Sequence, residues 1–369
     1  MEKEQPKLMI PGPVQPEDEV LNVLGQPVQA HYGPEWCDFY NQTVDYMKKV
    51  FCTKSDVFLM VGSGSAGIDS CIGSSFSTGD TIIVGINGFF GERIKSICES
   101  YGLKVIPVKS TWGAPLNPKD FILSLKANPA AQGIAVVHLE TSTTIINPIA
   151  KIGEIAKSYG VLFMVDAVSS LGGLPFNMEE WHIDLCASAS QKCLGAPPGL
   201  SPVAVSASGW QTIDRKSNRD HGWYLNLKIW RQYAKEWADW HPFPITMATS
   251  NVAALNTSLK ILMKEGLDRR IKRFHKLALR LRDGLSRIGM TPYTPEKLMA
   301  PVLTAVYSPE RIPSSRVVDY LLESHSIKIA GGLGILKDRV FRIGHMSPNI
   351  SEMDIDEVLS ALKDFKSMI

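Results

Sequence analysis

Short apolar runs rich in β-branched residues alternate with longer segments of helical period over residues 57–205. Apolar residues fill these runs instead of alternating with polar ones, which is typical of strands covered on both faces. Helix starts are indicated at Asn117-Pro118 and Asn147-Pro148, where an N-cap residue precedes a proline. The pattern predicts an α/β fold with a mostly parallel sheet of about seven strands. The expected strands are VFLMVG at 57, TIIVGI at 81, KVIPVK at 104, GIAVVHLE at 133, VLFMVDAV at 161, LCASAS at 185 and SPVAVSAS at 201.

The pattern changes after this sheet. Segment 210–241 contains many of the tryptophans, which favours either a packed cover over a site or a subunit interface, or else a pair of amphipathic helices. A long helix is expected over 252–288, followed by a smaller unit with three short strands, at 304, 327 and 340, and two helices. The last helix is expected to begin at Ser351-x-x-Asp354, a pattern typical of a capping box.

A length of 369 residues indicates two domains. We expect an N-terminal segment over 1–20 that packs near the active site, a large domain over 21–255 that binds the cofactor, and a small α+β C-terminal domain over 256–369. The cleft between the two domains is then the expected place of the active site.

Charge and composition exclude several classes of function. Lys and Arg number 39 against 37 Asp and Glu, so the basic patch of a nucleic-acid-binding protein is not expected. The chain has neither a long apolar run nor a signal-peptide core, so we expect a cytoplasmic protein with no membrane partner. The six cysteines form no CxxC pair and the eight histidines are dispersed, which argues against a metal site.

Candidate chemistry lies at strand ends, where ligands bind in open α/β sheets. Gly62–Gly67 (GSGSAG) follows the expected strand at 57, and its free N–H groups would favour a phosphate. The same residues match a dinucleotide fingerprint, but the next strand ends in Asn87-Gly88 and not in the acid that binds a ribose. A simple tight turn is the third interpretation.

Three other strand ends carry polar residues. Asp166 ends an apolar strand, where it needs a cation unless it caps the following turn. Lys192 follows another strand; desolvation would lower its pKa and allow a Schiff base, unless it is a surface lysine. The cluster 138–143 (HLETST) offers hydroxyls to a ligand or to the next turn. A phosphate-binding loop, a buried acid and a lysine are together the three points that hold pyridoxal phosphate.

Motifs along nearly the whole chain strengthen this hypothesis. The sequence resembles the class V aminotransferases of fold type I, within their alanine–glyoxylate and serine–glyoxylate aminotransferase branch. The residues that carry the resemblance are PGPV at 11, HYGPEW at 31, GSGSAG at 62, NGFFGER at 87, HLETST at 138, VDAVSSLGG at 165, SQKCLGAPPG at 190, GGLG at 331 and RIGHM at 342.

The resemblance implies pyridoxal 5'-phosphate as cofactor and a homodimer with shared active sites. Lys192 would form the Schiff base, Asp166 would pair with the pyridine nitrogen, and Arg342 with Gly12 would bind the substrate. The residues implied to bind the cofactor are Ser63, Gly64, Ser65, Phe90, Thr141, Asp166, Val168, Gln191, Lys192 and, from the second subunit, Thr246.

This sequence departs from the family pattern at a few positions. Ser65 replaces a histidine found in some members, Phe243 a tyrosine, and Thr144 the glycine of the more usual ETSTG. The departures concern phosphate binding and, most of all, the contribution of the second subunit.

The implied activity is ping-pong transfer of an amino group from a small amino acid, alanine or serine, to glyoxylate or pyruvate. Pyridoxamine–pyruvate aminotransferase is the alternative, because KCLGAPPGL and RIGHM resemble it strongly, although its phosphate loop carries an acid that GSGSAG lacks. Cysteine desulfurases need a cysteine in the C-terminal part, and none follows Cys193. A non-catalytic binding protein of the same fold would need neither Lys192 nor Asp166.

Overall fold

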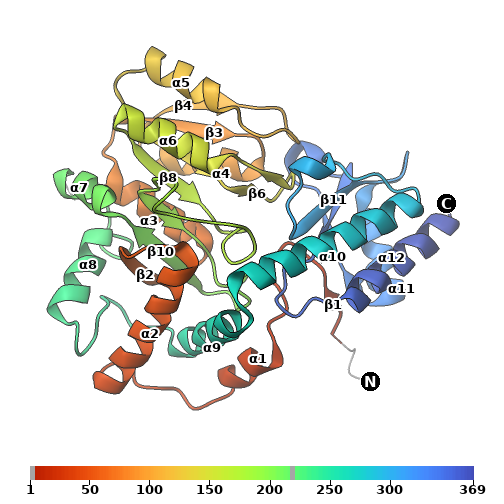
Figure 1. The fold of residues 1–369 in the computed structure, drawn as a ribbon, viewed down its shortest axis with the longest axis horizontal. Coiled ribbons are helices and arrows are strands. Elements are labelled where there is room, and N and C mark those ends of the chain that lie inside the picture. Colours follow the sequence, from red (N-terminus) through yellow and green to blue (C-terminus); the bar gives the residue numbers. More distant parts are fainter. Residues whose placement is uncertain (1–4, 217–220) are drawn as a thin grey trace.

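A seven-stranded sheet with helices packed against it forms the larger part of the computed structural model, which describes residues 5–216 and 221–369 (Figure 1). The first four residues of the predicted N-terminal segment, and 217–220 of the tryptophan-rich segment, lie outside the described residues. The smaller part, with the C-terminus, lies to one side of the sheet (Figure 1).

The sheet confirms the mostly parallel α/β prediction. Only β10 runs antiparallel to its neighbours within this sheet of described strands. Every residue of β8, β9 and β10 is buried, as their uninterrupted apolar sequences predict. In spatial order the strands are β2 (Asp56–Val61), β10 (Leu200–Val205), β9 (Leu185–Ala187), β8 (Leu162–Asp166), β5 (Ala131–Val137), β3 (Thr81–Ile86) and β4 (Lys104–Lys109).

Helices connect these strands. The predicted start at Asn117 is confirmed, since its side chain accepts a hydrogen bond from Lys119 N at 3.2 Å. A two-stranded hairpin follows β5 and supplies residues to the candidate site. The helices are α2 (Pro34–Phe51), α3 (Gly64–Ser75), α4 (Phe89–Ser100), α5 (Pro118–Ala127) and α6 (Ile149–Tyr159), and the hairpin is β6 (Leu139–Glu140) with β7 (Ile145–Ile146).

The described part of the tryptophan-rich segment contains a helix pair, α7 (Ala207–Arg215) and α8 (Leu227–Glu236). Trp210 and Trp230 are buried against the sheet, whereas Trp223, Trp237 and Trp240 are exposed. The interpretation as a helix pair is therefore confirmed for this part, with one set of rings in the core and another on the surface, while a cover over a site or a subunit interface stays a prediction.

The single long helix expected over 252–288 is instead two helices, α9 (Thr249–Glu265) and α10 (Leu267–Arg287). Gly266 separates them with φ +86°, a conformation that glycine adopts without a steric penalty. The periodicity of apolar residues continues across this break, so the sequence pattern alone conceals it.

The C-terminal part combines a small sheet with two helices. β14 (Val340–Gly344) lies between β11 (Leu303–Tyr307) and β13 (Ala330–Gly331), and α11 (Ser314–His325) and α12 (Glu352–Ser367) accompany them. The predicted capping box is present, because Ser351 and Asp354 hydrogen-bond each other's backbone N–H. Two 3-10 turns, η2 (Glu296–Leu298) and η3 (Gly334–Leu336), lie in the connections.

The N-terminal segment packs with the C-terminal part. Before α1 (Asp18–Leu24), strand β1 (Lys7–Leu8) pairs with β12 (Ile327–Lys328), and Met9 and Val14 join the apolar cluster of the C-terminal part. The main apolar cluster extends to Leu262 in α9. The predicted boundary at 255 falls inside α9, and the division into domains remains a prediction.

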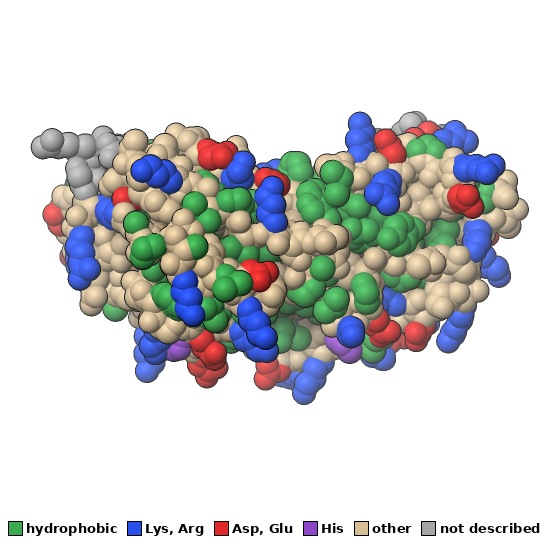
Figure 2. All heavy atoms as spheres, turned by 90° about the horizontal axis from the view of Figure 1, so that it is seen from above, with side chains coloured by type: hydrophobic (Ala, Val, Ile, Leu, Met, Phe, Trp, Pro, Cys, Tyr) green, Lys and Arg blue, Asp and Glu red, His purple; other side chains and the backbone are tan. Residues whose placement is uncertain are grey.

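Charged side chains of both signs are interspersed on the face shown in Figure 2, with apolar side chains gathered between them on its right half. Within residues 5–216 and 221–369, no helix combines the length and the apolar character needed to cross a membrane.

Candidate active site

A cavity of about 250 Å³ opens where several parallel strands of the sheet end. Because β2, β3, β5, β8 and β9 all end at this edge, the residues that follow them converge there. The lining residues are Gly12, Pro13, Ser63, Gly64, Ser65, Ile68, Phe90, Arg93, Val137, Leu139, Thr141, Asp166, Val168, Ser169, Gln191 and Lys192.

Most of the predicted site residues line this cavity. They are Gly12, Ser63, Gly64, Ser65, Phe90, Thr141, Asp166, Val168, Gln191 and Lys192. Two predicted residues do not: Arg342 lies behind the wall, and Thr246 is exposed elsewhere on the surface.

Lys192 follows β9 and is mostly buried. Its Nζ donates a hydrogen bond to the carbonyl oxygen of Pro11. A Cβ at Gly12 would lie 2.5 Å from Lys192 Cδ, so the N-terminal segment lies directly against the lysine stem. Burial is the main reason that the pKa of Lys192 falls to about 8. A fraction of this amine is therefore neutral, and nucleophilic, near physiological pH.

Asp166 is the last residue of β8 and is 4% exposed. Its Oδ1 accepts a hydrogen bond from Val168 N at 2.8 Å, so the residue also caps the following turn. Burial raises the pKa of Asp166 to about 6, against the opposing effects of the Val168 N–H and the Lys192 charge. A cation bound in the cavity would lower this pKa again.

The loop between β2 and α3 presents small polar groups to the cavity. Ser63 is the N-cap of α3, and Gly64 opens the helix. A Cβ at position 64 would lie 2.5 Å from Val168 Cγ2, so the close packing of the loop on Val168 requires glycine. Gln191 Oε1 is buried without a hydrogen-bond partner. The helix N–H groups and the two serine hydroxyls are donors and fit a phosphate-bearing ligand, whereas Gln191 Oε1 is an acceptor that would need a donor.

Sequence reasoning gave no role to Glu140, which is fully buried beside the cavity. Its Oε2 accepts hydrogen bonds from Phe90 N and Gly91 N, both at 3.1 Å. Its Oε1 accepts from Ser142 N at 3.1 Å and from Ser142 Oγ at 2.5 Å. Glu140 therefore fixes the amino end of α4 and with it the Phe90 ring. The sequence feature that could have indicated Glu140 is its place as the one acid in the polar cluster HLETST.

Arg93 also lines the cavity and was not predicted. It lies one helical turn after Phe90, and its guanidinium is 4.8 Å from the centroid of the Phe90 ring. Its Nη1 donates a hydrogen bond to Ser65 Oγ at 3.4 Å. The i, i+3 spacing from Phe90 could have indicated it, because such residues share a helix face.

Thr141 connects the cavity to Arg342. Its Oγ1 donates a hydrogen bond to Ser169 Oγ at 2.7 Å, and its carbonyl oxygen accepts from Arg342 Nη1 at 3.2 Å. Arg342 Nε donates to Gly331 O at 2.9 Å. Burial lowers the pKa of Arg342 to about 10, and the nearby Glu140 charge opposes the effect. The guanidinium is thus held in place, although it does not line the cavity.

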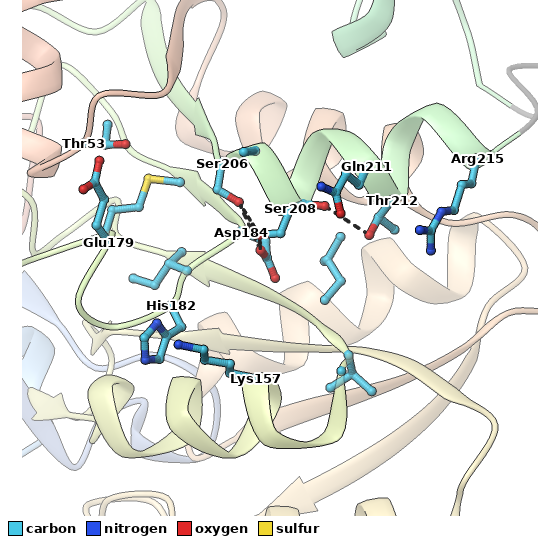
Figure 3. Close-up of a pocket in the computed structure, with 16 residues that line it drawn as sticks. Thr53, Lys157, Glu179, His182, Asp184, Ser206, Ser208, Gln211, Thr212 and Arg215 are labelled. Carbon is cyan, nitrogen blue, oxygen red and sulfur yellow. Dashed lines mark hydrogen bonds between the residues drawn. The ribbon is translucent and has the colours of Figure 1, made fainter.

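A second cavity, of about 500 Å³, lies at the opposite edge of the sheet, where β8 and β9 begin (Figure 3). Its acid Asp184 accepts hydrogen bonds from Phe163 N at 2.8 Å and Ser206 Oγ at 3.0 Å, and another from Ser208 Oγ. These bonds hold together the start of α7 and the adjoining strands. None of the predicted site residues lines this cavity, so the first cavity remains the candidate active site.

Comparisons with known proteins agree with this geometry. The family model of aminotransferase class-V matches residues 21–357. An uncharacterized aminotransferase of Methanocaldococcus jannaschii is 38% identical over 339 residues, which is 92% of this chain and 87% of that protein. The structure of alanine–glyoxylate aminotransferase from Nostoc sp. superposes with a TM-score of 0.94 at 28% identity, covering 99% of this chain and 96% of that one. Ureidoglycine–glyoxylate aminotransferase from Bacillus subtilis gives a TM-score of 0.94 at 30% identity, covering 99% and 93%.

Proposed function

Because the chain belongs to the class-V aminotransferase family and is a pyridoxal-phosphate-dependent transaminase, we propose that it transfers the amino group of alanine or serine to glyoxylate or pyruvate. One observation carries the proposal: Lys192 and Asp166 come from neighbouring strands and line one cavity. A family member that had kept only the fold would need neither group.

We propose that the cofactor binds in this cavity. Lys192 would hold it through Nζ, Asp166 would lie at the ring nitrogen, and Phe90 would stack on the ring. Ser63, Gly64, Ser65 and Gln191 would hold the phosphate, while Thr141 and Val168 would contact the ring. The start of α3 at Gly64 and the close packing that requires glycine at this position support the placement of the phosphate.

Pyridoxal phosphate, when bound, supplies an electron sink for negative charge at the substrate's α-carbon. Asp166 strengthens that sink, because a buried carboxylate keeps a neighbouring ring nitrogen protonated. Lys192 Nζ takes the α-proton and later returns it, a role for which a pKa of about 8 is well matched. Two half-reactions at the same lysine give ping-pong kinetics.

We propose that Arg342 binds the substrate carboxylate, which requires the guanidinium to reach the cavity past the Thr141 backbone that now lies in front of it. Its hydrogen bonds to Thr141 O and Gly331 O orient the guanidinium, which limits the entropy lost when it binds a carboxylate. Gly12 would leave room for the substrate beside Lys192, since any larger side chain there would contact the lysine stem.

The amino donor is tested by a screen of alanine, serine, aspartate and pyridoxamine against glyoxylate and pyruvate. We expect turnover with alanine or serine, and parallel lines in double-reciprocal plots. Activity with pyridoxamine alone would replace the proposal by the pyridoxamine–pyruvate alternative, although GSGSAG has no acid that would take the place of a phosphate.

The role of Lys192 is tested independently of the donor. The purified protein should be yellow, and borohydride should fix the cofactor on Lys192 in a peptide map. Full activity in a colourless Lys192→Ala protein would disprove the assignment. Lys95→Ala, at a lysine of α4 that does not line the cavity, is the matched control.

We also propose a homodimer in which Thr246 reaches the partner's phosphate site. Thr246 is exposed and does not line the cavity of its own chain, as expected of a residue that acts across an interface. Exposed aromatic side chains support the interface: Tyr32 is 53% exposed, Trp240 50% and Trp237 40%. Clustered rings of this kind mark protein–protein contacts.

We propose a cytoplasmic location. All six cysteines are free and five of them are buried, as expected of thiols kept in a reducing compartment.

A further inference from the structure

Two positively charged side chains line the cavity that is proposed to bind pyridoxal phosphate. Among its lining residues, only Lys192 and Arg93 are positively charged. In the proposed function Lys192 reacts with the cofactor's aldehyde carbon and is not available to the phosphate. A phosphate monoester carries between one and two negative charges at neutral pH. The serines, Gly64 and Gln191 proposed to hold it are neutral, so apart from the partial positive charge at the start of α3 these groups supply no cation.

Arg93 lies where it can supply that counter-ion. Its Nη1 reaches Ser65 Oγ at 3.4 Å, so the guanidinium borders the loop that would hold the phosphate. The Arg93 side chain is exposed, and aromatic rings of its own helix lie against it. The Phe90 and Phe89 rings pack against it, with centroids at 4.8 and 5.3 Å from the guanidinium carbon, and Glu140 anchors the helix that carries it. No ion pair engages Arg93 among the described residues.

We infer that Arg93 is the counter-ion of the cofactor's phosphate. Its positive charge beside Ser65 makes the site bind pyridoxal phosphate more tightly than unphosphorylated pyridoxal. This inference rests on the proposed function and adds a selectivity residue to it. A guanidinium forms two parallel hydrogen bonds with phosphate oxygens, which a lysine cannot do.

The placement of Arg93 also explains how a single protomer can bind the phosphate with a neutral serine at position 65. A neutral hydroxyl contributes a hydrogen bond and no charge, so a cation must come from another element. Arg93 supplies it from α4, through the contact with that same hydroxyl.

The test compares two ligands that differ only by the phosphate. Apoprotein of the wild type, Arg93→Gln and Arg93→Lys is titrated with pyridoxal phosphate and with pyridoxal, and Kd is read from the absorption of the bound ring. We expect Arg93→Gln to weaken binding of pyridoxal phosphate about tenfold while pyridoxal binding is unchanged. The Kd of Arg93→Lys for pyridoxal phosphate should lie between those of the wild type and Arg93→Gln. Lys95→Gln removes a charge from the same helix outside the cavity and should change neither Kd.

The outcomes separate this inference from the proposed function. Equal losses for both ligands would mean that Arg93 acts by supporting the Phe90 ring, and no loss for either would mean that it does not meet the phosphate; both overturn the inference and leave the transaminase assignment intact. A raised KM for aspartate with unchanged Kd values would place a substrate carboxylate at Arg93 and also overturn it. Wild-type protein that binds no pyridoxal phosphate would overturn the proposed function itself, and this inference with it.

Discussion

Two buried groups of opposite character determine the chemistry at the residue scale. Burial raises the pKa of Asp166 to about 6 and lowers that of Lys192 to about 8, so each side chain is shifted toward its neutral form. Such shifts weaken the folded state and are found where a protein needs reactive groups. A ligand that carries the complementary charges would recover the lost stability.

Removing the charge of Asp166 should uncouple cofactor binding from turnover. We expect Asp166→Ala and Asp166→Asn to keep part of the cofactor, because Lys192 and the phosphate loop remain, but to lose about a hundredfold in kcat. Absorption spectra and single-turnover kinetics measure the two effects. Wild-type rates in either variant would remove the proposed role of Asp166 at the ring nitrogen.

The cost of burying Lys192 has a predictable pH dependence. Below pH about 8 the amine is charged in both the folded and the unfolded apoprotein, so the folded state carries the full cost of burying that charge. Above the unfolded value of 10.5 the amine is neutral in both states and the cost disappears. Lys192→Met apoprotein should therefore be more stable than wild type at neutral pH, by up to about 3 kcal/mol, with the difference vanishing by the upper pH.

Urea unfolding of the two apoproteins across this pH range measures the difference. Other groups that titrate there do so in both proteins and cancel from the comparison. A difference that stays constant with pH would show that packing of the methionine, and not the lysine charge, is responsible.

At the scale of elements, the start of α4 depends on one buried acid. Glu140 accepts four hydrogen bonds, two on each carboxylate oxygen, from Phe90, Gly91 and Ser142. A glutamine has only one accepting oxygen. If the amide N–H2 group faced Phe90 N and Gly91 N, both donors would lose their acceptor. If it faced Ser142, the hydroxyl could turn to accept from it, but Ser142 N would still lose its acceptor.

Glu140→Gln should accordingly destabilise the protein by about 2–4 kcal/mol and loosen the Phe90 ring. Urea unfolding gives the stability change, and the absorption band of the bound cofactor reports on the ring. Glu99→Gln, at the exposed far end of the same helix, should leave both unchanged. Equal stability of Glu140→Gln and wild type would show that water replaces the carboxylate oxygen without cost.

Strands and strand-end residues were predictable because they depend on local pattern. The buried strands have uninterrupted apolar sequences, and the polar residues Asp166, at the end of β8, and Lys192, in the loop after β9, stand out from them. Glu140 and Arg93 could not be assigned roles in this way, because their partners are backbone and ring groups from other segments. The break at Gly266 and the orientation of Arg342 likewise depend on tertiary packing that a single sequence does not display.

At the scale of the whole molecule, the proposed homodimer makes each active site a property of two chains. If Thr246 acts in the partner's site, Thr246→Asp damages that site by placing a negative charge near the phosphate, and leaves the Lys192 of its own chain intact. Lys192→Ala damages only its own site. A heterodimer of the two variants would then contain one site with both defects and one site with neither.

Mixed refolding of Thr246→Asp and Lys192→Ala should therefore restore about a quarter of the wild-type activity, because half of the dimers are mixed and each has one intact site. Neither variant alone should approach this rate. Activity that is simply the average of the two homodimers would place Thr246 outside the partner's site.

The pairing of β1 with β12 makes the cavity wall depend on contacts between distant parts of the sequence. Gly12 and Pro13 form part of this wall, yet their position depends on contacts of Lys7 with Ile327 and of Met9 with Gly344. Residues 7–13 can therefore reach this position only when the strands around 327 and 344 have formed. Contacts so distant in sequence form late and slowly. The large sheet can thus fold before its pocket is closed, and an intermediate in which only the sheet has formed would lack a complete site.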